Sequence, residues 1–146
     1  MELRKGSHAV YDLKYDLVWA PKFRAHIFRG EVAGYVKQVF QQVAEEYGFW
    51  IDTMEVVEEH VHVFVAAPPR YSPAQLVQML KSISAREVFK KFPQIRKEMW
   101  SGKIWSDGYF ARSVGDAVTA DIIRRYIEYQ KHEIDSPQLR MFEKPR

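Results

Sequence analysis

The segment from residue 10 to residue 19 alternates between apolar and polar side chains, and no other stretch constrains the fold as strongly. Asp12, Lys14 and Asp16 fall between apolar residues that are spaced two apart. Side chains two apart on a strand share one face of a sheet. The period therefore predicts a β-strand with one buried side, formed by Tyr11, Leu13, Tyr15, Leu17 and Trp19.

After residue 19, segments with apolar residues at helical spacing alternate with segments that are typical of strands. Apolar residues at helical spacing from Val32 to Tyr47, stopped by Gly48, predict a helix. A second helix is predicted from the capping pattern at Ser72, and it should run to Phe92. The remaining predicted elements are strands at 50–57, 60–66 and 109–111 and a last helix that begins at Asp116 or Thr119 and ends near His132.

The order strand, helix, strand, strand, helix, strand, helix indicates an α+β fold of the ferredoxin-like (RRM-like) type. Such a fold has an antiparallel sheet with helices on one face, and here one extra C-terminal helix follows. We expect a single domain over residues 1–134, because the chain shows no repeats or Gly/Ser linkers. Residues 135–146, with two prolines, are expected to form a short tail.

The composition excludes several classes of protein. Apolar residues make up 47% of the chain and aromatic residues 14%, which is enough to fill a core at 146 residues. The lack of cysteine excludes disulfides and thiolate metal sites. No apolar run reaches the roughly 18 residues of a membrane span, so we expect a cytoplasmic protein without a membrane segment. The net charge of +3 permits binding to a polyanion without requiring it.

His60 and His62 lie two apart in the predicted strand 60–66 and so share one face. A lone histidine in such a strand is usually a hydrogen-bonded core residue. Two imidazoles on the same face, separated and flanked by valines, can converge on one divalent cation. Burying both without a shared partner would be costly. The pair is therefore a candidate metal site.

Tyr126 and Gln130 lie four apart on the last predicted helix and so stand on one face of it. The isoleucines around Tyr126 make a core position the ordinary interpretation of its spacing. Gln130 is an amide at the end of an apolar stripe, a place where a structural role does not require one.

Together these residues resemble the HUH endonucleases, and specifically the single-tyrosine, TnpA-type transposases of the simplest bacterial and archaeal insertion sequences (IS200-like). His60-Val61-His62 matches the His-hydrophobic-His element of the family, and residues 126–130 match its Tyr-x-x-x-Gln helix. The stretch Trp105-Ser106-Asp107-Gly108-Tyr109-Phe110 is also similar, and the likeness covers about residues 8–133 in consistent order.

The resemblance implies that His60, His62 and Gln130 hold a divalent ion, Mg²⁺ or Mn²⁺, although a two-histidine set would also accept Zn²⁺. It implies that Tyr126 attacks the scissile phosphate, which leaves a 5′-phosphotyrosine and a free 3′-OH. The expected substrate is single-stranded DNA with hairpins at the element ends, and the expected assembly is a homodimer.

Basic and aromatic residues are candidates for DNA contacts. Trp100 and Trp105 could stack on unpaired bases, and core burial is at least as good an interpretation for both. Many exposed cations only solvate a surface. The cations selected as phosphate contacts are Lys14, Arg24, Lys81, Arg86 and Arg112.

Two other functions fit the same pattern. Ferredoxin-like sheets also occur in non-catalytic modules that bind single-stranded nucleic acid, but such a module needs neither Tyr126 nor Gln130. A host-adopted relative that processes repeated hairpins would keep both residues, so the sequence separates it poorly from a mobile-element enzyme.

Overall fold

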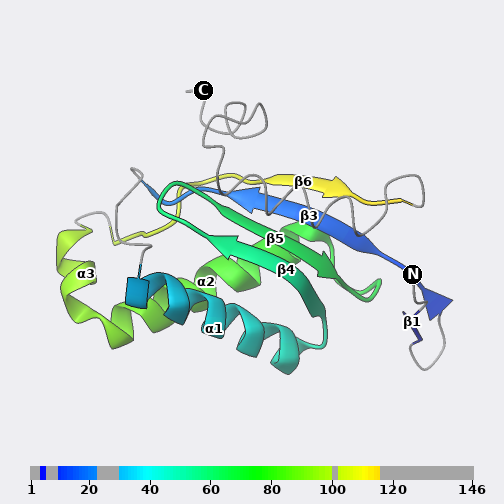
Figure 1. Ribbon diagram of the computed structural model, residues 1–146, viewed down its shortest axis with the longest axis horizontal. Coiled ribbons are helices and arrows are strands. Elements are labelled where there is room, and N and C mark those ends of the chain that lie inside the picture. Colours follow the sequence, from blue (N-terminus) through cyan, green and yellow to red (C-terminus); the bar gives the residue numbers. More distant parts are fainter. Residues whose placement is uncertain (1–3, 6–9, 23–29, 100–101, 116–146) are drawn as a thin grey trace.

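A four-stranded antiparallel sheet with helices packed against it organises the chain (Figure 1). The computed structural model describes residues 4–5, 10–22, 30–99 and 102–115. The spatial order of the strands is β4-β5-β3-β6, and each neighbouring pair is antiparallel. The strands of this sheet are β3 (Lys14–Trp19), β4 (Trp50–Val56), β5 (Val61–Ala66) and β6 (Phe110–Ser113).

Three helices and a small ribbon complete the described part of the chain. Helices α1 (Gly30–Tyr47) and α2 (Pro73–Lys91) lie together on one side of the sheet, as Figure 1 shows. Helix α3 (Pro93–Glu98) follows α2 almost directly. The strands β1 (Arg4–Lys5) and β2 (Val10–Tyr11) pair with each other in a separate two-stranded sheet.

Local sequence signals explain where the two long helices begin and end. Helix α1 stops at Gly48, whose φ of 76° is a left-handed conformation that glycine adopts without strain. Helix α2 begins with a capping box. The Gln75 backbone N–H donates to Ser72 Oγ at 3.1 Å, and the Ser72 N–H donates to Gln75 Oε1 at 2.8 Å. The chain therefore leaves α1 and enters α2 at defined points.

The core lies between the sheet and the two long helices. Trp19 of β3 is fully buried there and meets Phe40 of α1 edge-on, with ring centroids 5.8 Å apart. Trp105, from the loop before β6, contacts the same indole at 5.9 Å. Edge-to-face aromatic pairs of this kind add to the free energy of burial.

The mixed α and β fold around an antiparallel sheet is confirmed. The helices expected at 32–47 and 72–92 are present as α1 and α2, and the three later strands occur within one or two residues of their expected bounds. None of the described helices is long and apolar enough to cross a membrane. The last predicted helix and the tail at 135–146 lie outside the described residues.

Three details differ from the sequence-based expectation. The predicted strand 10–19 is broken at residues 12–13, because β2 pairs with β1 whereas β3 pairs with β5. The Leu13 carbonyl at this break accepts a hydrogen bond from the Ala67 N–H. His60 directly precedes β5 instead of belonging to it. The short helix α3 is an addition, since Pro93 predicts only the end of α2.

Candidate functional site

Strand β5 divides its side chains between the two faces of the sheet. Val61, Val63 and Val65 belong to the core beneath the helices. His62 and Phe64 alternate with them and therefore point to the opposite face. We call this opposite side the histidine face. Its members are His60, His62, Phe64, Asp16, Val18, Glu55, Phe110 and Arg112.

The sheet register defines the neighbours of His62. Val18 of β3 lies directly opposite it on one side, and Glu55 of β4 lies opposite it on the other. One step further along, Phe64 faces Asp16, which in turn faces Arg112 of β6. His62 thus lies on an inner strand of the sheet and His60 directly precedes that strand, with the charged residues Glu55, Asp16 and Arg112 on the other strands.

The two imidazole rings lie against each other, with centroids 4.7 Å apart and an interplanar angle of 76°. His60 is 2% exposed and His62 is fully buried. None of their four ring nitrogens has a hydrogen-bond partner among the described residues. Buried polar atoms are normally satisfied, and leaving one unpaired costs about 1–3 kcal/mol. An orphaned pair of imidazoles is the pattern expected of side chains that serve as ligands.

Burial keeps both histidines neutral. It lowers the pKa of His60 from 6.5 to about 4, an effect that the carboxylate of Glu55 partly opposes. Burial, together with a smaller effect of the neighbouring His60, lowers the pKa of His62 to about 3. Only a neutral imidazole can bind a metal through its free nitrogen, so the environment holds both side chains in the coordinating form.

The chemistry of this pair fits a divalent cation, with two nitrogen donors available and no protein partner competing for them among the described residues. No group of three or more His, Asp, Glu or Cys side chains in the described ranges could hold a metal ion. Within the described residues, the two histidines are therefore the candidate ligands. Gln130, the third ligand implied by the family resemblance, lies outside them.

Asp16 is a buried acid on the same face that the sequence does not single out. It is fully buried, and neither of its carboxylate oxygens has a hydrogen-bond partner among the described residues. Arg112 Nη2 lies 3.5 Å from Asp16 Oδ2. Burial raises the pKa of Asp16 to about 6, although the Arg112 guanidinium acts in the opposite direction. The position of Val18, an apolar residue among the polar ones of this strand, is the signal that this face is buried as well.

Comparison with known proteins identifies the family. The family model described as "Transposase IS200 like" matches residues 9–130, which is most of the chain. The chain belongs to the IS200-like transposase family. The family is one of DNA transposases, and the match includes the positions of Tyr126 and Gln130.

Individual IS200-like relatives agree with this assignment. The ISDra2 transposase TnpA of Deinococcus radiodurans is 36% identical over 130 residues, covering 89% of this chain and 92% of the relative. The transposase for insertion sequence element IS200 of Salmonella typhimurium is 27% identical, covering 87% of this chain and 82% of the relative.

Solved structures resemble the fold. A crystal structure of a Deinococcus radiodurans protein assigned as a transposase has a TM-score of 0.70 and 34% identity, and the match covers 87% of this chain and 97% of that one. A REP-associated tyrosine transposase, solved with a REP hairpin, has a TM-score of 0.56 and 14% identity, covering 88% of this chain and 75% of that one. At that identity the second likeness concerns the fold alone.

The structure describes only some of the residues predicted for catalysis and DNA binding. Tyr126, Gln130 and Arg24 lie outside the described residues. Lys14 forms an ion pair with Asp12. Lys81 is half-buried, and its ammonium donates to the carbonyl oxygens of Ser106 and Gly108, both at 2.8 Å.

Two of the other predicted phosphate contacts have accessible side chains. Arg86 is 69% exposed and pairs with Glu87 at 3.2 Å, and Arg112 is 46% exposed on the histidine face. Trp105 is buried, and its indole N–H donates to Ser84 Oγ at 2.9 Å, so this ring belongs to the core. Trp100 lies outside the described residues.

Proposed function

We propose that this transposase cuts and rejoins single-stranded DNA at hairpin-marked ends through a 5′-phosphotyrosine on Tyr126. The proposal includes a metal site made by His60, His62 and Gln130 for Mg²⁺ or Mn²⁺. The observation that carries it is the buried imidazole pair, whose four ring nitrogens lack partners among the described residues. Membership of the IS200-like family supports the same chemistry.

The reaction exchanges one phosphoester bond for another. The Tyr126 oxygen attacks the phosphorus, the bond from phosphorus to the 3′ oxygen breaks, and the leaving strand takes up a proton to become a 3′-OH. The phosphotyrosine keeps the bond energy, so a 3′-OH can later attack it and restore the DNA without ATP. An unperturbed phenol has a pKa near 10, so only about a thousandth is ionised at pH 7. Tyr126 therefore needs a neighbour that favours loss of its proton.

A bound divalent ion would polarise the scissile phosphate as a Lewis acid. Two neutral imidazoles and an amide bring no negative charge, so such a site keeps the full positive charge for the phosphate. Arg112 lies on the same face and is half-exposed, which suits its guanidinium to contact the DNA backbone.

Three further features belong to the proposal. The strand order β4-β5-β3-β6 supports the ferredoxin-like arrangement, in which a C-terminal helix carrying Tyr126 would be an addition. Hairpin binding is extended to this chain from the family resemblance, and a REP-associated transposase of similar fold was solved with a hairpin. A homodimer is proposed on the family resemblance alone.

Covalent capture tests the proposed reaction. The protein is incubated with Mn²⁺ and a hairpin oligonucleotide from the ends of its own element, labelled at the 3′ end so that the label stays with the phosphotyrosine. A denaturing gel should show a labelled protein–DNA adduct. Tyr126→Phe should abolish the adduct, because the phenylalanine ring has no nucleophilic oxygen.

Tyr129→Phe is the matched control, since it removes another hydroxyl from the same predicted helix. It should leave the adduct intact. An adduct that persists in Tyr126→Phe would reject this nucleophile. Hairpin binding by the wild-type protein without any adduct would favour the non-catalytic binding module instead.

A further inference from the structure

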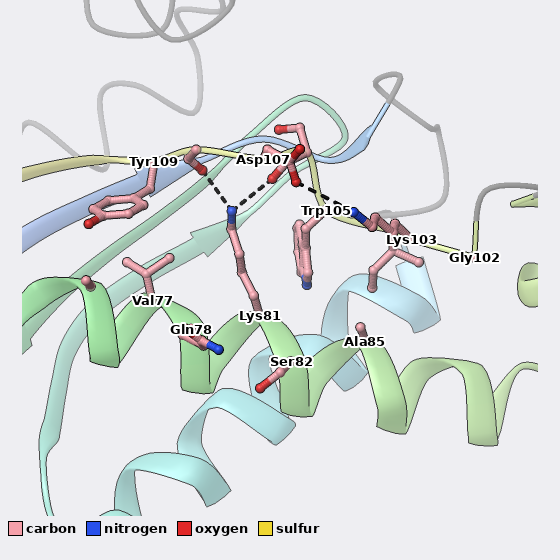
Figure 2. A pocket seen from close by; sticks show the side chains of 14 residues that line it. Val77, Gln78, Lys81, Ser82, Ala85, Gly102, Lys103, Trp105, Asp107 and Tyr109 are labelled. Atoms are coloured by element: carbon pink, nitrogen blue, oxygen red, sulfur yellow. Dashed lines mark hydrogen bonds and ion pairs between the residues drawn. The ribbon is translucent and has the colours of Figure 1, made fainter.

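A cavity of about 540 Å³ lies between α2 and the loop that leads into β6, and none of the residues that line it belongs to the histidine face. Figure 2 shows α2 along one side of it and residues 102–109 along the other. The volume falls within the roughly 300–1,000 Å³ typical of small-ligand sites. The loop contains the Trp-Ser-Asp-Gly-Tyr-Phe stretch, to which the proposed reaction assigns no role.

The walls of the cavity are held in place by hydrogen bonds between α2 and the loop. Lys81 rises from α2 and its ammonium binds two loop carbonyls, those of Ser106 and Gly108, as Figure 2 shows. Burial lowers the pKa of Lys81, and the carboxylate of Asp107 partly offsets that effect. Trp105 is fixed to α2 through Ser84. The cavity is therefore preformed, which reduces the entropic cost of filling it.

The lining combines an apolar interior with a polar rim. Val77 and Ala85 of α2 and Ile104 and Trp105 of the loop are the apolar members of the lining; all but Ala85 are at most 5% exposed, so they close its interior. Tyr109 also lines the cavity and is 40% exposed, so a large part of its surface is accessible. A planar ligand with apolar faces can stack in such a place.

Polar groups at the cavity suit the edge of a base and a nearby phosphate. Gln78 and Ser82 of α2 offer amide and hydroxyl groups for hydrogen bonds. Lys103 is 61% exposed, and its ion pair with Asp107 is long, at 3.9 Å. Exposed pairs of this kind contribute little, so Lys103 is able to turn toward a phosphate.

The cavity adjoins the path that DNA would follow from the histidine face. Tyr109 lines the cavity, and the next residue, Phe110, begins β6 opposite Val18, in the same cross-strand row as His62. Since neighbouring strands are about 4.8 Å apart, His62 and Phe110 are separated by only about 10 Å across the sheet. Strand β6 is the edge of the four-stranded sheet. A single strand can thus pass over this edge from one site to the other.

We propose that this cavity receives an unpaired base of the bound DNA, with Tyr109 as the stacking surface. The inference rests on the proposed single-stranded substrate and adds a specific recognition site to it. Stacking on an aromatic ring tolerates any base, so the site would retain unpaired nucleotides without reading their sequence.

A comparison of binding affinities, made with the full chain, tests the inference. The probes are a fluorescent oligothymidylate and an abasic sugar–phosphate strand of the same length, and the measurement is the Kd by anisotropy. The wild-type protein should bind the thymidylate more tightly. Tyr109→Leu should reduce this preference by roughly ten-fold, since one stacked base contributes about that factor. Ser82→Leu, which fills the cavity from an exposed position on α2, should have the same effect.

Tyr47→Leu is the matched control. Tyr47 is 38% exposed, almost the same as Tyr109, but it ends α1 and does not line the cavity. It should leave the preference for bases unchanged. An equal preference in wild type, Tyr109→Leu and Ser82→Leu would overturn the inference. A change in self-association of the cavity variants, seen by sedimentation without any change in base preference, would assign the cavity to a second copy of the chain and would also overturn it.

Failure of this inference can be separated from failure of the proposed function. If the wild-type protein forms the Tyr126 adduct but neither cavity variant changes the base preference, only the cavity assignment is wrong. If the wild-type protein forms no adduct and binds neither strand, the single-stranded substrate itself is wrong.

Discussion

The two faces of the sheet use the same strands under opposite physical rules. On the helix-covered face, Leu17, Trp19 and the β5 valines pack against apolar side chains of α1 and α2, and among them only the Trp19 indole N–H lacks a hydrogen-bond partner among the described residues. On the histidine face, equally buried residues carry nitrogens and oxygens that have no hydrogen-bond partner among the described residues. The first face stabilises the fold. The second is costly to the fold unless something binds there, which is typical of functional sites.

The largest effect should come from the helix-covered face. Phe40→Ala removes a fully buried ring that contacts both Trp19 and Trp105. Large-to-small changes of this kind cost about 3–5 kcal/mol, through lost burial and the cavity left behind. Urea unfolding should show that loss, whereas the Mn²⁺ affinity of the folded variant should match the wild type. Loss of Mn²⁺ binding under conditions where the variant is folded would contradict the view that the helix-covered face does not contribute to metal binding.

The stabilisation by bound metal should depend on the histidine face alone. At a concentration of 100 times its Kd, Mn²⁺ should raise the free energy of unfolding by about 2.7 kcal/mol, because it binds the folded state only. A chelator should reverse the gain. His62→Leu should abolish it, and the metal-free variant should be at least as stable as the wild type, because leucine buries no unpaired nitrogen. Calorimetric unfolding with and without Mn²⁺ measures both effects, and a metal gain that survives in His62→Leu would contradict the site.

Per pH unit, the change in stability of the metal-free protein should be the smallest of these effects. The folded pKa values of His60 and His62 lie near 4 and 3, below the ordinary 6.5. Between about pH 6.5 and 4 the unfolded chain therefore binds more protons, and each histidine lowers stability by about 1.4 kcal/mol per pH unit as the pH falls.

The effect of Asp16 on the pH dependence of stability should cancel that of one of the two histidines. Its folded pKa of about 6 lies above the ordinary 3.8, so the folded state binds the proton first and stability rises as the pH falls from about 6 to 4. The net loss in this range should be about 1.4 kcal/mol per pH unit, and Asp16→Asn should double the slope. Urea titrations at several pH values measure it, and equal slopes for the two proteins would show that Asp16 does not take up this proton.

The sequence predicts the features that local chemistry determines. The end of α1 at Gly48 and the start of α2 at Ser72 depend on neighbouring residues only, and both are confirmed. The shared face of His60 and His62 follows from the period of a strand, in which side chains two apart point the same way. The same period places the valines of β5 on the opposite face, so the orientation of the pair relative to the core is local information as well.

The features that the sequence does not predict depend on distant partners. Asp16 and Lys14 have the same pattern in the sequence, and only the register with β5 and β6 separates the buried acid from its partly exposed neighbour. Lys81 is selected as a phosphate contact from its charge. Its two carbonyl acceptors come from a loop about 25 residues away, which no local period reveals.

The alternation of valine and histidine in β5 also protects the chain while it folds. A pairing shifted by one residue would turn every side chain of this strand to the other face. His60 and His62 would then enter the apolar core, and the valines would leave it. The misaligned sheet would therefore be less stable on both of its faces. The residues proposed to bind the metal therefore also favour the correct register of β5 during folding, an effect that does not require bound DNA.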